Sequence, residues 1–348
     1  MLKRLITMCM LSAMLGTAAG VVPAFAQDAT PDATPQAAEE VTSVIIDSDM
    51  ISDDWMATLF VLNDPRFDVQ AITVSGTGFA ADCPAAVLAA QGMVGLVEYG
   101  NIPIACGAET PLVGDNAPPA DWRTTQEMVQ ELGLPAGGTV VEEDAVRLFT
   151  TTVQNAPEPI TVLALGPLTN IGAALEATPE LIDNIEMIYV MGGAVDVEGS
   201  YVSDENTTAE WNIFSDPHGA KLTFDSGVPI TLVPLDATNE VPVTPEFVAQ
   251  LEADASTPAA EFVATLLFNN AESIESGSYF FWDPLAAVVM ADPSIVTLTP
   301  RTVSVVDIPG DPEDGRTMPD DNGTEILVAT DPDATALEAV LIAMWNAS

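Results

Sequence analysis

The stretch that decides the fold is VIIDSDMISDDWMATLF, residues 44–60. Its first residues, Val44–Ile46, form an apolar run typical of a buried strand, and Trp55–Phe60 has the pattern of a helix. The turn between the two carries four aspartates: Asp47, Asp49, Asp53 and Asp54. One carboxylate is enough to cap a helix. Four that repel one another indicate instead a site for a hard cation, Ca²⁺ or Mg²⁺, because both ions are bound by oxygen ligands.

Outside this stretch, strand and helix patterns alternate as far as residue 290. The expected strands are apolar runs: VTSVIID, VQAITVS, IPIAC, ITVLAL, EMIYVMGG and PITLVPL. This alternation predicts an α/β fold with an open, mostly parallel, doubly wound (Rossmann-like) sheet and helices on both faces. Residues 295–345 contain two strand-like runs around an acidic loop, which predict a small C-terminal β addition and a last helix. Ligands of such sheets bind outside the carboxyl ends of the strands, where the four aspartates fall.

The chain divides into three parts by composition. Residues 1–26 combine Lys3 and Arg4, an apolar stretch and an Ala-Phe-Ala cleavage site, which is the pattern of a secretory signal peptide. Residues 27–41 are rich in Pro, Ala and acids and predict a disordered tether. Residues 42–348 contain no clear linker and are expected to form a single domain. We therefore expect an exported protein, periplasmic or extracellular, after removal of the signal peptide.

The charge of the chain argues against two classes of partner. There are 52 acidic and 8 basic residues, which give a formal net charge of −44. Phosphate backbones and anionic lipids both attract clustered Lys and Arg, so neither a nucleic acid nor a membrane is an expected partner. A small molecule together with a cation fits this charge better, and the formation of a homo-oligomer is left open.

The histidine and the cysteines narrow the chemistry further. His218 is the single histidine, so the chain cannot contain both a Ser–His–Asp system and a histidine-rich metal site. After the signal peptide only Cys83 and Cys106 remain, and neither has a second Cys or His at zinc-binding spacing. In an oxidising compartment the two cysteines could pair, and two buried free thiols are the alternative.

Five segments together resemble the inosine–uridine-type nucleoside hydrolases. Residues 47–54, DSDMISDD, are similar to the family's D-x-D-P-G-x-D-D, with Met-Ile in place of Pro-Gly. The other four follow in the family's order: LGPLTNIGAAL (165–175), VMGGA (190–194), AEWNIFSDPHGA (209–220) and FWDPLAAV (281–288). The resemblance covers residues 43 to about 290. It implies an N-glycosidase that splits a ribonucleoside into base and ribose and uses one Ca²⁺ at the strand ends.

The resemblance also implies roles for single residues. The Ca²⁺ ligands would be Asp49, Asp54, the backbone carbonyl of Leu165, and Asp283. Asp49 would also be the general base for a metal-activated water. Ribose hydroxyls would be bound by Asp53, Glu210 and Asn212. Asp47 would support the loop. Carboxylates around the sugar would stabilise the positive charge of an oxocarbenium-like transition state.

Three departures from the family pattern bear on function. The family's asparagine after the second strand has no counterpart, because Gly76-Thr77-Gly78 stands there, which removes one sugar contact that the resemblance implies. Where well-studied members carry a histidine as leaving-group acid, this chain has Trp282, which could stack on the base or pack in the pocket wall. The family's Gly-Asn before the fourth segment reads Gly-Ser here, and Asn206 is the candidate to replace its asparagine as a sugar ligand. Loss of the histidine leaves a non-catalytic riboside-binding module as an alternative. A D-x-D phosphatase with Asp47 as nucleophile is a further one, which leaves the G-P-L-T-N segment unexplained.

Overall fold

The computed structural model describes residues 41–347. The predicted signal peptide and all but one residue of the predicted tether lie outside the described residues. Within them, ten strands form one sheet: β1 (Thr42–Ser48), β2 (Phe67–Val74), β3 (Pro103–Cys106), β4 (Thr139–Val140), β5 (Ile160–Ala164), β6 (Ile185–Met191), β7 (Ile230–Val233), β8 (Thr297–Val305), β9 (Thr317–Pro319) and β10 (Thr324–Thr330).

Thirteen α-helices occur in the same part of the chain: α1 (Ser52–Asn63), α2 (Cys83–Leu96), α3 (Gln126–Glu131), α4 (Ala145–Asn155), α5 (Thr169–Ala177), α6 (Trp211–Ser215), α7 (Pro217–Phe224), α8 (Leu235–Thr238), α9 (Pro245–Asp254), α10 (Pro258–Asn269), α11 (Ala271–Glu275), α12 (Trp282–Ala291) and α13 (Ala334–Trp345). Three short 3₁₀ helices join them: η1 (Ala120–Trp122), η2 (Pro179–Asn184) and η3 (Pro293–Ile295). None of the described helices is both long and apolar enough to cross a membrane.

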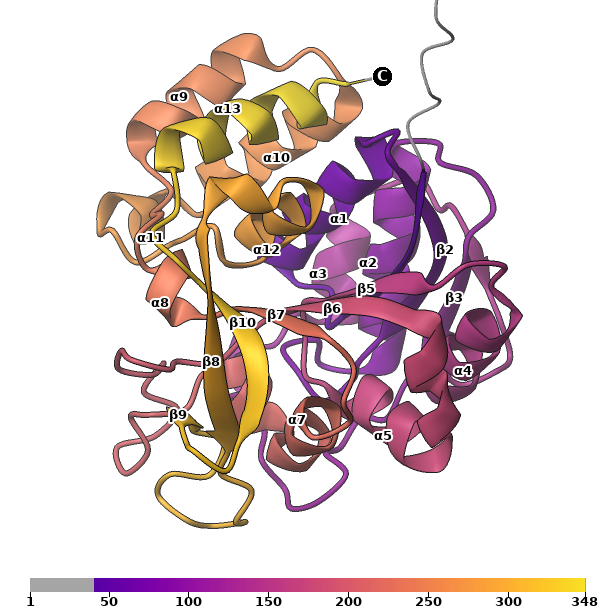
Figure 1. The fold of residues 1–348 in the computed structure, drawn as a ribbon. Helices are drawn as coiled ribbons and strands as arrows, with labels where there is room; N and C mark the ends of the chain where they lie inside the picture. The colour runs from indigo at the N-terminus through magenta and orange to yellow at the C-terminus, as the bar shows by residue number, and fades with distance from the viewer. Residues whose placement is uncertain (1–40, 348) are drawn as a thin grey trace, which may run out of the picture. The chain divides into compact units, whose positions relative to one another are not determined.

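The strand order confirms the predicted doubly wound sheet. It is β4-β3-β2-β1-β5-β6-β7-β10-β8-β9 (Figure 1). All pairs from β4 to β10 are parallel, whereas β8 runs antiparallel to both β10 and β9, which confirms the small C-terminal β addition. β1 pairs with β2 on one side and with β5 on the other. Successive strands are therefore added on one side of β1 as far as β4, and on the other side from β5 onward. Such a switch in strand order leaves a crevice at the carboxyl ends of the two adjacent strands.

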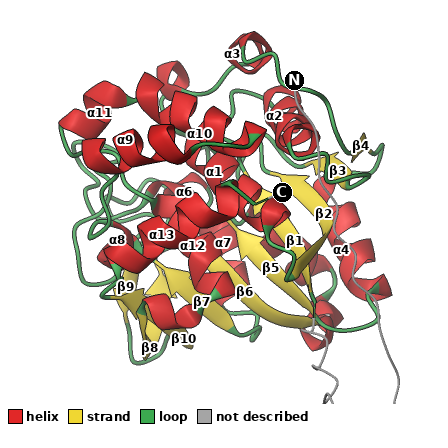
Figure 2. Ribbon diagram, turned by 90° about the horizontal axis from the view of Figure 1, so that it is seen from above, coloured by secondary structure: helices red, strands yellow, loops and turns green. Residues whose placement is uncertain are grey.

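The apolar run of β1 is buried because helices cover both faces of the sheet (Figure 2). Val44 and Ile46 belong to the core beneath α1, α2 and α12, and Ile45 belongs to the core beneath α4, α5 and α7. This alternation is the two-residue period of a strand. In α1, every residue from Asp54 to Leu62 is buried, because this helix is packed between the sheet and α12.

Part of the acidic excess caps helices. The side chains of four aspartates accept a backbone N–H from the first turn of the helix that follows: Asp82 for α2, Asp144 for α4, Asp216 for α7 and Asp333 for α13. A side-chain cap of this kind stabilises a helix by about 1 kcal/mol. Residues 257–274 form two helices, α10 and α11, that meet at Asn270.

Candidate active site

A cavity of about 420 Å³ lies at the carboxyl ends of the central strands. Residues that follow β1 and β5, and Met191 at the end of β6, all contribute to its lining. This is the place where the strand order reverses, and hence where a ligand is expected. Of the predicted site residues, seven side chains and the Leu165 position line it: Asp49, Asp53, Asp54, Leu165, Glu210, Asn212, Trp282 and Asp283.

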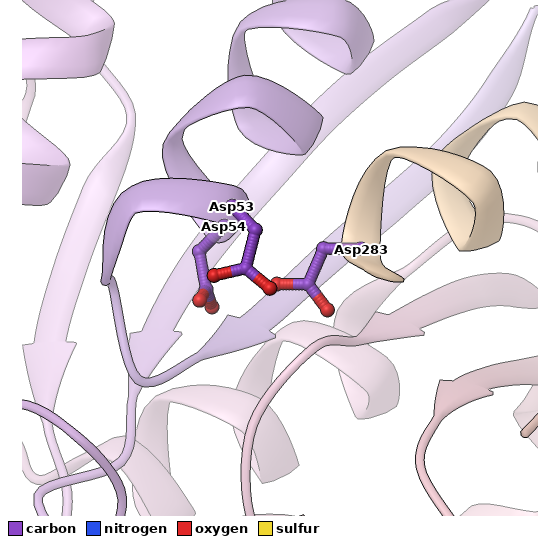
Figure 3. A group of neighbouring side chains, drawn as sticks. All are labelled: Asp53, Asp54 and Asp283. Atoms are coloured by element: carbon purple, nitrogen blue, oxygen red, sulfur yellow. The ribbon is translucent and has the colours of Figure 1, made fainter. Parts of the chain in front are cut away.

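Four acids, which we call the acid cluster, converge on this cavity: Asp49, Asp53, Asp54 and Asp283. Asp53 and Asp54 lie in the first turn of α1, and Asp283 lies in the first turn of α12. Carboxylate oxygens of these three lie within 4.8 Å of one another (Figure 3). The carboxyl of Asp54 also lies close enough to those of Asp49 and Asp283 for its charge to act on both. The first strand–helix turn and a helix more than 200 residues later in the chain therefore share one site.

Asp49 enters the cluster from the end of β1 and is 1% exposed. One of its oxygens accepts the backbone N–H of Phe79. Gly78 lies so close that a β-carbon there would come within 1.9 Å of that carboxylate oxygen. The glycine is therefore required by the approach of Asp49 rather than by an unusual backbone angle. The Gly76–Gly78 segment, where the family's asparagine is absent, makes room for the first acid of the cluster.

Burial and mutual repulsion raise the pKa values of the cluster. Loss of water raises the pKa of Asp53 to about 7, and the charges of Asp49 and Glu210 add to this rise. The pKa of Asp54 is also raised to about 7, by burial and then by the charge of Asp53. Burial and the charge of Asp54 raise the pKa values of Asp49 and Asp283 well above the ordinary range. Carboxylates held together in this way need protons or a cation.

Glu210 and Asn212 come from the short helix α6. Glu210 caps this helix and accepts N–H groups from Asn212 and Ile213 and, across the site, from Gly193 at 2.9 Å. The side-chain amide of Asn212 donates to the carbonyl of Leu165 at 2.8 Å. The carbonyl predicted to bind Ca²⁺ is thus oriented by a residue predicted to bind the sugar.

Two predicted residues lie behind the cavity rather than in it. Asp47 is fully buried and accepts hydrogen bonds from Thr73 and from Asn170, at 2.5 and 2.9 Å. This position fits a supporting role. Asn206 does not fit a role as sugar ligand. Its Nδ2 donates to the Asp314 carbonyl at 2.8 Å and its Oδ1 accepts the N–H of Ala209 at 3.1 Å, so both ends of the amide hold the loop together.

The cavity also has an aromatic wall that the sequence does not predict, formed by Phe79, Trp122 and Trp211. The ring centroid of Trp211 lies 5.5 Å from that of Phe79 and 5.9 Å from that of Trp122, both edge-on. Trp122 is 61% exposed and reaches the cavity from η1. Trp282 belongs to a separate group, 5.4 Å from the ring of Tyr279. Phe79 lies in a loop and Trp122 in the three-residue helix η1, both too short for a periodic pattern, so no sequence pattern marks them.

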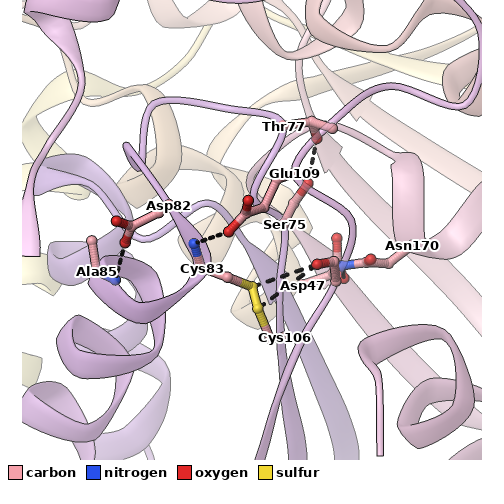
Figure 4. The surroundings of a disulfide bond; sticks show 10 residues. Asp47, Ser75, Thr77, Asp82, Cys83, Ala85, Cys106, Glu109 and Asn170 are labelled. Atoms are coloured by element: carbon pink, nitrogen blue, oxygen red, sulfur yellow. Dashed lines mark hydrogen bonds between the residues drawn. A yellow bond between two sulfur atoms is a disulfide. The ribbon is translucent and has the colours of Figure 1, made fainter.

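The remaining histidine and the cysteines lie outside the cavity lining. His218 pairs with Asp307 at 2.8 Å and is partly buried. Cys83 and Cys106 form a disulfide that joins the start of α2 to the end of β3 (Figure 4). Gly107, next to Cys106, packs so closely on Asn170 that a β-carbon there would clash with its amide. The disulfide thus fixes the segment at Gly107, which packs on Asn170, a hydrogen-bond partner of Asp47.

Comparisons with known proteins agree with this geometry. The family model described as inosine-uridine preferring nucleoside hydrolase matches residues 44–339. The chain is 31% identical over 268 residues to the pyrimidine-specific ribonucleoside hydrolase RihA of Citrobacter koseri, covering 75% of this chain and 83% of the relative. It is 33% identical over 229 residues to the protein of the same name from Shewanella woodyi, covering 64% and 69%.

Solved structures share the fold. An inosine-uridine preferring nucleoside hydrolase from Bacillus anthracis superposes with a TM-score of 0.78 at 22% identity, over 88% of this chain and all of that one. The plant nucleoside hydrolase PpNRh1 superposes with a TM-score of 0.75 at 25% identity, over 88% and 99%. The family model and the similarity to relatives along most of the chain confirm what the five segments predicted: this chain belongs to the inosine-uridine preferring nucleoside hydrolase family.

Proposed function

We propose that the protein hydrolyses the N-glycosidic bond of ribonucleosides in a calcium-dependent reaction that yields free base and ribose. The observation that carries the proposal is the convergence of Asp49, Asp53, Asp54 and Asp283 on one cavity that also has aromatic walls. A ribose with its polar hydroxyls suits the acids, and a flat base suits the rings. Membership of the family supports the same reaction.

The donors present fit a calcium ion. Asp49, Asp54, Asp283 and the carbonyl of Leu165 would hold it, and Ca²⁺ accepts six to eight such oxygens in flexible geometry. Buried carboxylates with raised pKa values are what a cation would neutralise. A bound ion would offset their repulsion and polarise the attacking water.

The chain's own residues have the remaining tasks. Asp49 takes a proton from the attacking water, which suits a carboxyl whose pKa burial raises well above its ordinary range. Asp53, Glu210 and Asn212 bind ribose hydroxyls. The same carboxylates lie where the sugar becomes positively charged as the bond to the base breaks, and they stabilise that charge. Asp47 supports the end of β1 from behind, through its bonds to Thr73 and Asn170.

The departing base has no histidine to protonate it among the cavity-lining residues. Trp282 occupies the place of the family's leaving-group acid. A base stacked on this ring would be easier to protonate, by water or by another group, because the electron-rich face of the indole favours positive charge. The same replacement leaves one alternative function to be tested, a module that binds ribosides without cleaving them.

Base release from a panel of purine and pyrimidine nucleosides separates these functions. The panel is run with calcium and with chelator, on the wild type, on Asp49→Ala and on the control Asp183→Ala, which changes an exposed acid of η2. We expect calcium-dependent release by the wild type and the control, and none by Asp49→Ala. Binding of both calcium and a riboside by the wild type without base release would establish the binding module instead.

We further propose that the protein is exported, as its first 26 residues predict. The disulfide between Cys83 and Cys106 supports this, because such bonds persist in oxidising compartments. The mature protein is expected to begin at Gln27. N-terminal sequencing of protein recovered outside the cytoplasm tests it, and an intact Met1 on that protein would contradict it.

A further inference from the structure

The turn that carries the acid cluster has an unusual backbone. Met50, between Asp49 and Asp53, has a φ of +55° although it carries a β-carbon. In this left-handed region the β-carbon crowds the carbonyl oxygen, so residues other than glycine adopt it at a cost. Met50 is completely buried. Contacts elsewhere in the structure must therefore stabilise the left-handed backbone conformation at Met50.

The polar groups of Met50 are all held. Its carbonyl accepts the indole N–H of Trp55 at 2.7 Å. Its N–H lies 2.9 Å from the hydroxyl of Ser48 and 3.2 Å from a carboxylate oxygen of Asp54. The Ser48 hydroxyl in turn donates to the same Asp54 oxygen. The turn is thus tied to the acid cluster on one side and to Trp55 on the other.

Trp55 is well placed to restrain the backbone at Met50. It follows Asp54 directly in α1, is 5% exposed, and packs on Phe262 of α10 with ring centroids 6.1 Å apart. Its ring is therefore fixed by the core, and its N–H reaches back over the first turn of the helix to Met50. Without this bond Met50 would be held only through its N–H, by Ser48 and Asp54, and its backbone would be freer to relax toward a commoner conformation. Asp49 would then shift relative to Asp53 and Asp54.

We propose that Trp55 is a positioning residue: its indole N–H locks the left-handed turn at Met50, and this lock holds the acid cluster in the geometry that binds a divalent cation. The inference rests on the proposed function for the identity of the ion. Trp55 does not line the cavity, so its effect acts through Met50.

The chain contains a matched control. Trp345 of α13 is also buried, and its indole N–H also donates to a carbonyl of α1, that of Met56, at 3.0 Å. Trp55→Phe and Trp345→Phe each remove one indole N–H and keep an aromatic ring. Both are expected to lower the melting temperature. Only the first removes a bond to the turn.

Calcium binding to the full chain without nucleoside, measured by calorimetry, is the main readout. We expect Trp55→Phe to bind calcium roughly three- to tenfold more weakly, the range of one lost hydrogen bond, and Trp345→Phe to stay within about twofold of the wild type. Saturating calcium is expected to restore most of the kcat of Trp55→Phe. Equal calcium affinity in Trp55→Phe and the wild type, or an equal loss in both variants, would overturn the proposal.

Met50→Gly supplies a second test. Glycine adopts positive φ readily, so the turn no longer needs to be forced. In this background Trp55→Phe is expected to weaken calcium binding by less than it does with Met50 present. An undiminished loss would overturn the lock, as would Trp55→Phe failing to fold in both backgrounds, since Trp55 would then be a core residue only. A wild type that binds calcium but releases no base would contradict the proposed hydrolysis and leave these comparisons valid.

Discussion

The acid cluster and the aromatic wall line the same cavity but are built in opposite ways. Asp49, Asp54 and Asp283 are 1–2% exposed and come from the end of a strand and the first turns of two long helices. The wall comes from loops and short helices, and Trp122 is 61% exposed. Regular elements packed on both sides allow little movement, whereas loops are more mobile and more variable.

This difference assigns different tasks to the two regions. Chemistry that depends on charge requires a dry, fixed arrangement, because electrostatic interactions weaken in water. Recognition of a flat base by stacking tolerates small shifts and different bases. We therefore expect changes in the acid cluster to affect all nucleosides alike, and changes in the wall to depend on the base.

The largest effect is expected for Asp283→Asn. The loss of one charged ligand lowers the affinity for calcium and removes several kcal/mol of charge stabilisation from the transition state. Base release should therefore fall about a thousandfold for every nucleoside. The measurement is kcat/KM on a purine and a pyrimidine nucleoside. Asp292→Asn, at the other end of α12, is the control and should behave as the wild type. A loss confined to one base would contradict the division of tasks.

The next effect is that of pH on calcium binding. The pKa values of Asp47, Asp53 and Asp54 are raised from 3.8 to about 7 by burial. The calcium-free folded protein therefore binds more protons than the unfolded chain between about pH 4 and 7, and its stability falls as pH rises through that window. Calcium replaces the protons, so its affinity should be about a hundredfold higher at pH 8 than at pH 5.

Melting curves with calcium and with chelator at both pH values check this. Calcium should raise the melting temperature much more at pH 8 than at pH 5, and should do so weakly in Asp283→Asn. The same calcium-induced shift at both pH values would show that the cluster is not protonated at pH 5.

A smaller effect is expected for Trp282. Replacement of its ring by Leu should lower kcat about tenfold, because stacking of a base on an aromatic ring is worth roughly 1–3 kcal/mol. Trp282→Phe keeps a ring and should lose less than half of that free energy. The size of the loss should differ between purines and pyrimidines. Equal kcat values for the Leu and Phe variants on every nucleoside would make Trp282 a packing residue.

The smallest effect is expected for Trp122→Ala. This side chain is mostly exposed, so the fold should not suffer. KM should rise about threefold with kcat little changed, since the loop contributes to binding and not to the chemistry. Steady-state kinetics on two nucleosides checks the split. A drop in kcat equal to that of Trp282→Leu would show that Trp122 acts in the chemical step, and would contradict the assignment of the aromatic wall to binding.

The sequence predicts the regular elements of this molecule better than its loops and long-range contacts. The sheet and the acid turn were predictable, because apolar strands, helices and four adjacent aspartates are local patterns. The role proposed for Asp283 was inferred only from the family resemblance, since no local pattern relates α12 to β1. Asn206 was assigned to the sugar, yet a contact with Asp314 of the distant β addition occupies its amide. The pairing of Cys83 with Cys106 likewise depends on α2 and β3 being neighbours.

We propose above that one calcium ion is held by acids of the first strand–helix turn and of α12, more than 200 residues later in the chain. A crystal structure grown with calcium and a non-hydrolysable riboside tests it most directly. We expect a single ion at roughly 2.3–2.6 Å from oxygens of Asp49, Asp54, Asp283 and the Leu165 carbonyl, with the ribose beside it. An acid cluster that stays free of metal at saturating calcium, with the riboside bound elsewhere, would contradict it.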